Sequence, residues 1–558
     1  MAPGSNPEWT IVDFIHHGPW WTNRGILLLN LCLFLPLLTS SVNGLDSSLI
    51  NGLQILPDWQ DFFGHPEGVT LGVIQSAQNM GAFICLPLTP FAADILGRRA
   101  ALFIGSVILL CGVAIQFSAS SVKVFIVARV ILGCGLAFCT NSAPLLLLEL
   151  AYPTQRGKIT SFYNSSWYFG SIISAWVCYG SFIHAKGSIW SWRVPTLIQA
   201  VAPLLQVCLI WCVFTPESPR YLVSKGYEGK AARILAKYHA NGGDERDPLV
   251  VFELAQIRHA LRIEEDINKS TSYLSLVSTP GNRKRMMLVL AIAIFSQWSG
   301  NGLVSYYINL VLEGVGITKP ETKAAINGGL QVFNLVVALS AASLIDWVGR
   351  RKLFIISNSG MLVAFGCWTI TEALFNEFKK VSAAKATIPL IFLFYFFYGI
   401  AYTPMLVAYT LEILPYKIRA KGFAVMNIAI MLTSAFNQCV NPWAIDAIGW
   451  WYYIVYCGWL IIELVFVVAF IVETKGRTLE ETAALFDGDE QPQDLANMGG
   501  EAATLTMNRG LALQLQERPS SHSDDRDHKH DIFESSQPML RVTVERSVCT
   551  DSEVGRAI

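Results

Sequence analysis

The chain has 558 residues, of which 53% are hydrophobic and only 15% carry a charge. About a quarter of the residues in a soluble globular domain are charged, so this composition excludes an ordinary soluble protein and favours a lipid bilayer as the solvent. The formal net charge is −1, which gives no basis for binding nucleic acid.

Apolar windows long enough to cross a bilayer occur twelve times along the chain. A spanning helix needs roughly 20 mostly apolar residues, and small or helix-bending residues interrupt most of these windows, as is common where membrane helices pack closely. The pattern predicts an all-α membrane protein with twelve transmembrane helices in two six-helix halves. The windows lie near residues 25–43, 70–91, 99–119, 124–147, 161–183 and 195–214, and near 287–311, 325–345, 353–374, 388–411, 421–442 and 450–472.

Polar stretches divide the chain into five predicted parts. An N-terminal segment, 1–24, precedes a six-helix bundle at 25–214, and a polar loop at 215–286 leads to a second bundle at 287–473. Residues 474–558 are rich in Gln, Asp, Glu, Ser and Arg and lack periodicity, so we expect a largely disordered tail.

The polar loop has a helical pattern of its own. Apolar residues recur at helical spacing around Ala231 and again around Leu254. We therefore expect short amphipathic helices that pack under the bundle.

Lysine and arginine are concentrated in the loops that follow even-numbered windows. Arg98 and Arg99 follow the second window, and Arg350 and Arg351 follow the eighth, whereas the loop after the first window has neither residue type. The loop after the ninth window, which has three lysines, is the exception. Because basic loops stay on the cytoplasmic side, we expect both termini and the 215–286 loop to be cytoplasmic.

Three charged motifs occur once in each half, at corresponding windows. The paired motifs are Asp94-Ile-Leu-Gly-Arg98-Arg99 with Asp346-Trp-Val-Gly-Arg350-Arg351, Glu149 and Arg156 with Glu412 and Arg419, and Glu217 and Arg220 with Glu473 and Arg477. Carboxylates and guanidiniums form strong bidentate pairs, so we expect these residues to link helices within and between the halves as a cytoplasmic gate. Anchoring of loops at the membrane interface is the alternative, but it requires neither a motif nor a repeat.

The repeated motifs resemble those of the sugar porter family within the major facilitator superfamily. Further matching marks are Arg129 with Gly133 and Gly135, Trp192-Arg-Val-Pro, Pro216-Glu-Ser-Pro-Arg-Tyr-Leu and Glu473-Thr-Lys-Gly-Arg-Thr-Leu-Glu. The resemblance covers about residues 25–485. Within the family, Asn43-Gly-Leu-Asp46-Ser-Ser and Gln297-Trp-Ser-Gly-Asn-Gly302 are most similar to the fungal lactose permease and cellodextrin transporter branch. The resemblance implies the major facilitator fold and secondary active transport of a sugar by alternating access.

Polar side chains in the middle of the windows are the candidate sugar ligands. A sugar is bound through directional hydrogen bonds to its hydroxyls and through an aromatic face, and an amide both donates and accepts. Each amide could instead merely bridge two helices. The candidates are Asn164, Gln297, Asn301, Asn334, Asn437 and Gln438, with Tyr306 and Tyr307 two helical turns below Gln297.

The resemblance supports some of these candidates and modifies others. It implies sugar contacts for Asn164 in the fifth window, Gln297 in the seventh and Asn334 in the eighth. The chain departs from the family pattern at three positions, with Ser296 in place of Gln, Gly302 in place of Asn and Val407 in place of a stacking Trp. Smaller side chains make a wider site, which suits a disaccharide or another bulky substrate.

Asp46 and Arg129 are charges in the interior of predicted spans. A charge at mid-helix costs about 2.5–3.5 kcal/mol on insertion scales, so such residues pair or face a cavity. The resemblance implies that they are the pair that couples protons in the family's symporters, and a permanent structural ion pair is the alternative. Glu463, another acid within a span, is expected to make a helix–helix contact.

The motifs of other classes are missing from the sequence. It has no Gly-x4-Gly-Lys-Ser/Thr loop, no Gly-x-Ser-x-Gly elbow and no clustered His and Cys, so we expect no enzyme activity, no cofactor and no metal. The expected partners are a sugar, a proton and the lipid bilayer, and we expect a monomer in the plasma membrane. Two alternatives remain: a sugar sensor that does not transport, and a transporter of a polyol, quinate or another metabolite.

Overall fold

The structure is a computed structural model in which every regular element is a helix, as far as the chain is described. The described residues are 20–212, 215–270, 272–379, 381–475 and 486, and the side chains of a few helical residues among them are not described. The predicted tail lies outside these residues apart from Phe486.

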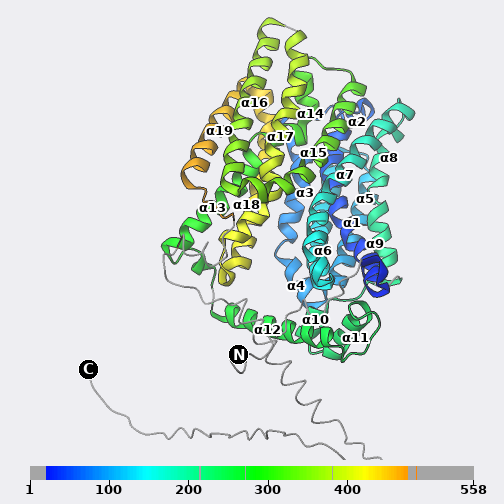
Figure 1. The fold of residues 1–558 in the computed structure, drawn as a ribbon. Coiled ribbons are helices and arrows are strands. Elements are labelled where there is room, and N and C mark those ends of the chain that lie inside the picture. Colours follow the sequence, from blue (N-terminus) through cyan, green and yellow to red (C-terminus); the bar gives the residue numbers. More distant parts are fainter. Residues whose placement is uncertain (1–19, 213–214, 271, 380, 476–485, 487–558) are drawn as a thin grey trace, which may run out of the picture. The chain divides into compact units, whose positions relative to one another are not determined.

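The N-terminal half and the following loop contain twelve α-helices in the described residues. Those of the half are α1 (Arg24–Leu53), α2 (Pro57–Phe63), α3 (Gly68–Cys85), α4 (Leu88–Ile95), α5 (Arg98–Phe117), α6 (Val122–Leu150), α7 (Arg156–His184), α8 (Trp190–Ile198) and α9 (Val201–Cys212). Those of the loop are α10 (Pro219–Ser224), α11 (Glu228–Tyr238) and α12 (Pro248–Ser270). The loop helices lie together at one end of the bundle, at the bottom of Figure 1, where α10 contacts α6 and α11 contacts α1.

The C-terminal half repeats the arrangement of long helices. It contains α13 (Pro280–Trp298), α14 (Asn301–Gly314), α15 (Pro320–Val348), α16 (Arg350–Phe378), α17 (Val381–Ile413), α18 (Tyr416–Ile448) and α19 (Trp451–Phe470). In the described part of the chain, ten helical segments are long and apolar enough to cross a membrane, and the bent pair α3 and α4 makes eleven. The serine-rich α7 is not among them, although it has 29 residues, as many as α6. These segments agree with the predicted twelve-helix fold.

Two predicted spans are broken rather than continuous. The second window is divided between α3 and α4, whose axes differ by 52°, around Pro87, which lacks an N–H for the helical ladder. The seventh window ends at Trp298 and restarts at Asn301, because Gly300 adopts φ 101°, a conformation that favours glycine. Gln297 therefore lies on α13 and Tyr306 on α14, within one apolar span.

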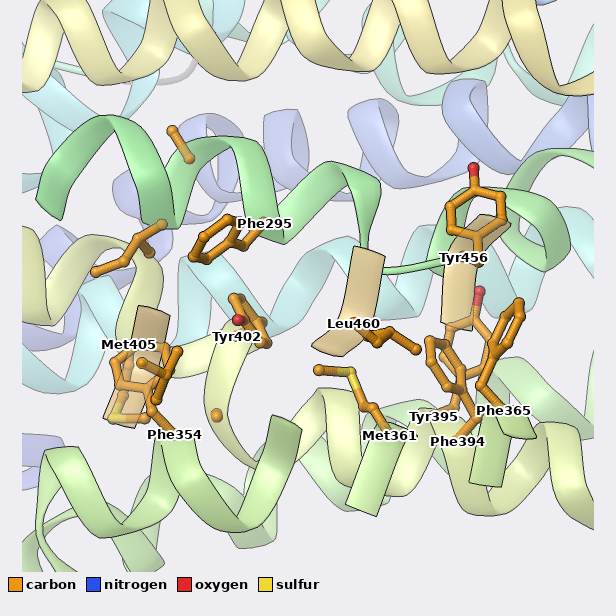
Figure 2. Close-up of a cluster of buried hydrophobic side chains, with 14 of the residues drawn as sticks. Phe295, Phe354, Met361, Phe365, Phe394, Tyr395, Tyr402, Met405, Tyr456 and Leu460 are labelled. Atoms are coloured by element: carbon orange, nitrogen blue, oxygen red, sulfur yellow. The ribbon is translucent and has the colours of Figure 1, made fainter. Parts of the chain in front are cut away.

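Each half has its own buried core. In the C-terminal half, aromatic, methionine and aliphatic side chains from four helices interdigitate, including Phe295 of α13, Phe365 of α16, Tyr402 of α17 and Leu460 of α19 (Figure 2). Since lipid is as apolar as these side chains, membrane helices are held together by close packing more than by apolar burial. The shape of the packed side chains therefore decides which helices associate.

Close backbone approach joins helices within a half. A Cβ on Gly170 of α7 would overlap the Ser41 carbonyl of α1, and one on Gly44 of α1 would overlap the backbone of Trp167. Small residues of this kind allow membrane helices to come into direct contact. The halves meet through other pairs, with α3 against α18, α7 against α15 and α1 against α14.

One glycine in each half begins the helix that follows the repeated Asp motif. Gly97 precedes α5 with φ 102°, and Gly349 precedes α16 with φ 100°. A Cβ on Gly349 would lie 2.9 Å from Oε2 of Glu473. The motif therefore needs glycine both for its backbone conformation and for space.

We predict that Gly349→Ala destabilises the protein by about 1–3 kcal/mol, because alanine disfavours this backbone conformation. Gly366→Ala in the same helix is the matched control, since no atom lies within 4 Å of its added Cβ. Thermal melting of the purified variants in detergent measures the effect. Equal melting temperatures for the two variants would contradict the explanation.

Candidate functional site

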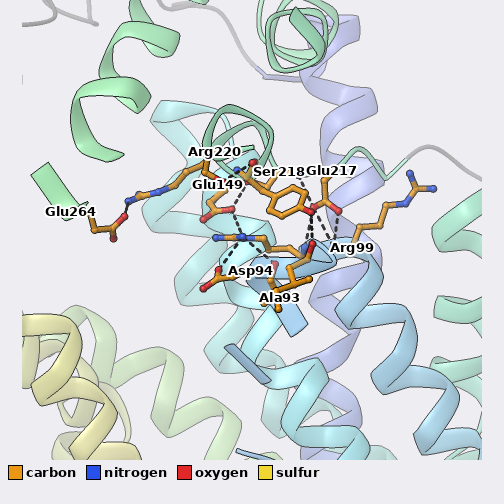
Figure 3. Close-up of polar contacts among 12 residues, drawn as sticks. Ala93, Asp94, Arg99, Glu149, Glu217, Ser218, Arg220 and Glu264 are labelled. Atoms are coloured by element: carbon orange, nitrogen blue, oxygen red, sulfur yellow. Dashed lines mark hydrogen bonds and ion pairs between the residues drawn. The ribbon is translucent and has the colours of Figure 1, made fainter. Parts of the chain in front are cut away.

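Arg98 lies between two carboxylates at the end of the N-terminal half that faces α10. Its Nε is 3.2 Å from Oε2 of Glu149, and its Nη1 is 3.3 Å from Oδ1 of Asp94 (Figure 3). The Arg98 and Glu149 side chains are 12% and 10% exposed, whereas that of Asp94 is 69% exposed. Shielded pairs are weakened less by solvent and salt, so Arg98–Glu149 is the pair that holds α5 to α6. The hydroxyl of Ser218 also donates to Glu149.

Glu217 caps the first turn of α5 from a distant segment. Its carboxylate accepts hydrogen bonds from the backbone N–H of Arg98 at 3.1 Å and of Arg99 at 3.3 Å. The first N–H groups of a helix have no partner within the helix and attract negative charge, and Gly97 has no side chain to supply it. Burial raises the pKa of the Glu217 carboxyl, and the opposing effects of its N–H donors and of the Arg98 charge do not reverse the shift.

The C-terminal half contains a corresponding ion pair. Arg350 donates from Nη2 to Oε1 of Glu412 at 2.9 Å, and its Nε lies 3.2 Å and 3.3 Å from the two carboxylate oxygens. The Thr474 hydroxyl donates to Oε2 of Glu412 at 2.5 Å. The pair joins α16 to α17 and to the segment that follows α19.

Glu473 caps α16 as Glu217 caps α5. It accepts hydrogen bonds from the backbone N–H of Arg350 at 2.8 Å and of Arg351 at 3.1 Å. Burial raises the pKa of Glu473, but the backbone donors of Lys475, Arg350, Arg351 and Thr474 outweigh burial, so that the pKa lies below its ordinary value.

The two clusters correspond contact by contact. Their equivalent contacts are Arg98–Glu149 and Arg350–Glu412, Ser218–Glu149 and Thr474–Glu412, Arg99 to the Ile210 carbonyl and Arg351 to the Val468 carbonyl, and Arg156 to the Ala151 carbonyl and Arg419 to the Leu414 carbonyl. Each half is therefore braced in the same way at the same end.

The remaining gate residues connect to α12 or lie outside the described part of the chain. Arg220 pairs with Glu264 at 2.6 Å, and Arg156 lies 3.7 Å from the buried Glu253. The side chain of Asp346 and all of Arg477 are outside the described residues. The described ion pairs at these helix ends join residues of one half, or a half to α12, and the expected pairs between halves stay a prediction.

Asn301 is the centre of a polar cluster at the break between α13 and α14. Its Nδ2 donates to the Ser296 backbone carbonyl at 3.2 Å and to the Tyr398 hydroxyl at 3.1 Å. The Tyr395 hydroxyl donates to the backbone carbonyl of Asn301 at 2.7 Å. Among the described residues no group donates to the buried Oδ1 of Asn301. This acceptor is therefore buried and unpaired among the described residues.

Asn437 and Gln297 lie close together beside this cluster. Asn437 of α18 donates to the backbone carbonyl of Gln297 at 2.6 Å and accepts from the Tyr456 hydroxyl at 3.0 Å. The Gln297 amide donates to the hydroxyl of Ser296 at 3.2 Å. Asn437 therefore joins three helices, whereas the side chain of Gln297 bonds only locally in the described contacts.

Tyr306 adds an aromatic side chain and leads to a contact between the halves. Its hydroxyl lies 3.4 Å from Oγ of Ser434, to which Asn79 of α3 donates at 3.1 Å. Asn79 also donates to Gln438 at 2.9 Å. We did not predict Asn79 from the sequence, although an amide in the middle of the second window is a signal of the same kind.

Two predicted ligands lie apart from the Asn301 cluster. Asn164 is exposed on α7, and Asn334 is buried on α15. The described contacts connect neither of them to Asn301. The sequence also gave no indication of Tyr395 and Tyr398, which hold Asn301, because tyrosines are common within these apolar windows.

Asp46 and Arg129 lie side by side in the N-terminal half, and both are almost completely buried. Nη1 of Arg129 donates to the backbone carbonyl of Asp46 at 3.2 Å. Neither carboxylate oxygen of Asp46 makes a hydrogen bond of ordinary geometry with the described residues, although the Gln199 amide faces this carboxylate. Burying such a charge is costly, so this carboxyl group is suited to binding and releasing a proton.

The two repeated halves, the ion-pair clusters at their helix ends and the polar contacts between the halves define a multi-pass membrane carrier of the major facilitator type. The chain matches the family model "Sugar (and other) transporter" over residues 32–486 and belongs to that family.

Several known proteins are similar to the chain. The sugar transporter STL1 of Saccharomyces cerevisiae is 29% identical over 483 residues, which cover 81% of this chain and 80% of the relative. The high glucose sensor RGT2 of the same yeast is 27% identical over 458 residues, covering 79% of this chain and 58% of the sensor. The inward-open xylose transporter XylE from E. coli has a TM-score of 0.66 at 23% identity, covering 82% of this chain and all of XylE. These relatives are transporters and a sensor, not enzymes.

The two capping carboxylates predict opposite effects of acid on stability. The folded-state pKa of Glu217 is raised, so its contribution to the stability of the fold grows as the pH falls through that pKa. The folded-state pKa of Glu473 is lowered, so its contribution to stability is lost as the pH falls toward that pKa. Between about pH 7 and about pH 4, the melting temperature of the wild type should rise relative to Glu217→Gln and fall relative to Glu473→Gln. Differences of the same sign for both variants would contradict this assignment.

Proposed function

We propose that this protein carries a sugar across a membrane by alternating access, with the Asn301 cluster as part of the sugar site. The buried Oδ1 of Asn301, which has no described donor, is the observation that carries this proposal. Around it lie hydroxyls of Tyr395 and Tyr398, whose rings provide an apolar face. Hydroxyl-directed bonds beside aromatic rings are what a sugar requires.

The substrate site we propose combines both halves. Asn301, Gln297, Asn437 and Tyr306 come from the C-terminal half, and Asn164 would join them from α7. Transporter sites lie where the repeated halves meet. Asn334 is included on the resemblance alone.

We propose that the helix-end clusters face the cytoplasm, as the basic loops predict, and that both termini are on that side, in the plasma membrane. The hydrogen bonds described between the halves, such as those of Asn79 and Asn51, lie away from this end. Each cluster stabilises the helix ends of its own half. The inner gate would form where the cluster of one half approaches the cluster of the other half.

Asp46 and Arg129 are proposed as the proton-coupling pair. The carboxylate is buried and faces the Arg129 guanidinium and the Gln199 amide. A proton on Asp46 would weaken its attraction to Arg129 and so favour closure around the sugar. The solved structure of XylE named as a proton:xylose symporter has a TM-score of 0.63 with this chain.

We infer a disaccharide of the lactose or cellobiose kind as the substrate, as in the fungal lactose permease and cellodextrin transporter branch. Ser296, Gly302 and Val407 replace larger side chains of the family pattern, which would widen the site, although the Asn437 amide packs against Gly302. A sensor is the second candidate, because the glucose sensor RGT2 is among the relatives. A polyol or another metabolite as cargo would keep the fold and change the site.

We expect Asp46→Asn to abolish accumulation of labelled sugar against a gradient while sugar exchange continues, because Asn cannot carry the proton. Uptake is measured with and without a protonophore, in cells that lack their own carriers, for a panel of hexoses, disaccharides and polyols. Glu463→Gln is the matched control, since Glu463 is also a fully buried acid within a span. Normal accumulation by Asp46→Asn would exclude the proton role, and a lack of uptake for the whole panel would favour the sensor.

Asn301→Ala should raise the KM for the transported sugar about tenfold, the equivalent of one lost hydrogen bond. Asn376→Ala is the control, because the Asn376 amide donates only to a carbonyl of its own helix in the described contacts. An unchanged KM with Asn301→Ala would show that Asn301 is not part of the sugar site.

A further inference from the structure

A groove lies between α1, the end of α9 and the loop helix α11, near the end of the bundle where the loop helices lie (Figure 1). Its volume is about 430 Å³. The apolar part of its wall comes from α1 and α9 and consists of Leu28, Leu31, Phe34, Leu35 and Leu209. Leu31 and Phe34 are 64% and 56% exposed, and both belong to the apolar window of α1. This wall therefore faces the acyl chains of the bilayer.

The groove extends from the surface of the bilayer into its interior. Leu28 and Leu35 lie about 6 Å and about 16 Å along the axis of α1 from Arg24, its first residue, at the helical rise of about 1.5 Å per residue. The exposed Trp20 and Trp21 come just before this helix, and tryptophan is enriched where a membrane meets water. A lipid could therefore place its headgroup and the start of its chain in the groove.

Two polar side chains line the groove where α11 meets the chain that follows α9. Lys237 of α11 is exposed, and its Nζ lies 5.0 Å from the centre of the Tyr238 ring. Thr215 is 1% exposed, and its hydroxyl makes no hydrogen bond with the described residues. A buried hydroxyl without a hydrogen bond is costly. The groove therefore combines an ammonium group and an unsatisfied hydroxyl with an apolar wall.

The charges around this polar part of the groove favour an anion. The Arg99 guanidinium lies 4.3 Å from the centre of the Trp211 ring and is close enough to Tyr238 to interact with its hydroxyl electrostatically. The nearby carboxylate of Glu217 already accepts the backbone N–H groups at the start of α5. A ligand with a negative headgroup and an apolar chain therefore matches both parts of the groove.

We propose that this groove binds one anionic phospholipid, with an acyl chain against α1 and α9 and the headgroup at α11. Lys237 neutralises the headgroup charge, and the Thr215 hydroxyl donates to an ester or phosphate oxygen of the lipid. A zwitterionic phospholipid has no net charge for Lys237, and a free fatty acid has no ester or phosphate oxygen for Thr215. The bound lipid joins the loop helix α11 to two spans of the N-terminal half, at a site separate from the proposed sugar site.

The test is photo-crosslinking of the full-length protein in lipid nanodiscs. Each sample contains a trace of one probe with a diazirine in its acyl chain: phosphatidylserine, phosphatidylcholine or a free fatty acid of the same chain length. Mass spectrometry locates the labelled residues. We expect phosphatidylserine to label residues 28–35 about threefold to tenfold more than phosphatidylcholine does, the range expected for one lysine acting on an anionic lipid.

Substitutions in the groove separate its two polar contacts. Lys237→Ala should lower labelling by phosphatidylserine to the level of phosphatidylcholine. Lys230→Ala should leave labelling unchanged and is the matched control, because Lys230 is an exposed lysine of the same helix that lies over the Tyr227 ring, outside the groove. Thr215→Val keeps the side-chain shape and removes the hydroxyl, so it should lower labelling by both phospholipids and not by the fatty acid.

Equal labelling by phosphatidylserine and phosphatidylcholine in the wild type would overturn the proposal, because it indicates ordinary contact with the bilayer. Labelling by the fatty acid alone, or an equal loss with Lys230→Ala and Lys237→Ala, would also overturn it. If Thr215→Val does not fold, as judged by its melting transition, the comparison of the two lysine variants decides. Since the labelling needs no sugar, its outcome does not depend on the proposed transport function.

Discussion

The structure depends on one constraint: polar groups inside a bilayer must find their partners within the protein. The capping of α5 and α16 shows how this chain meets it. Each helix begins at a glycine that has no side chain to cap the first turn, and Glu217 or Glu473 accepts those N–H groups instead. Because the caps come from the segments after α9 and α19, capping also ties the last helix of each half to its third span, α5 or α16.

Charged bonds and neutral bonds have different places in the molecule. The shielded guanidinium–carboxylate pairs lie within a half, where breaking one would leave a poorly solvated charge. The hydrogen bonds described between the halves are made mainly by amides and hydroxyls, such as those of Asn51, Asn79 and Tyr168. The charged pair Lys186–Glu321 also links the halves, but both of its side chains are exposed. Neutral interhelical bonds in membranes are weak. The polar bonds within each half are therefore stronger than those described between the halves.

Several buried polar groups lack a described hydrogen-bond partner, and groups of the proposed sites are among them. Both oxygens of the Asp46 carboxylate and Oδ1 of Asn301 are buried without a hydrogen bond of ordinary geometry from the described residues. Unpaired polar atoms in a low-dielectric interior are costly, and a proton or a sugar hydroxyl would satisfy them. The Glu463 carboxylate is also buried without a hydrogen bond of ordinary geometry to the described residues. Glu463 faces the Trp459 side chain of the same helix.

The sequence by itself determined the all-helical membrane fold and its two repeated halves, because hydropathy and charge placement are strongly constrained in lipid. It also identified Arg98, Glu149, Arg350 and Glu412, since charged residues at membrane helix ends are sparse and these recur as motifs. Only the tertiary structure decided where the seventh span breaks and that Asn51 of the other half bonds to its backbone, because such a bond depends on how helices distant in sequence pack. The same reason separates Asn301, which the fold places among tyrosine hydroxyls, from Asn164 and Asn334, which look equivalent in sequence.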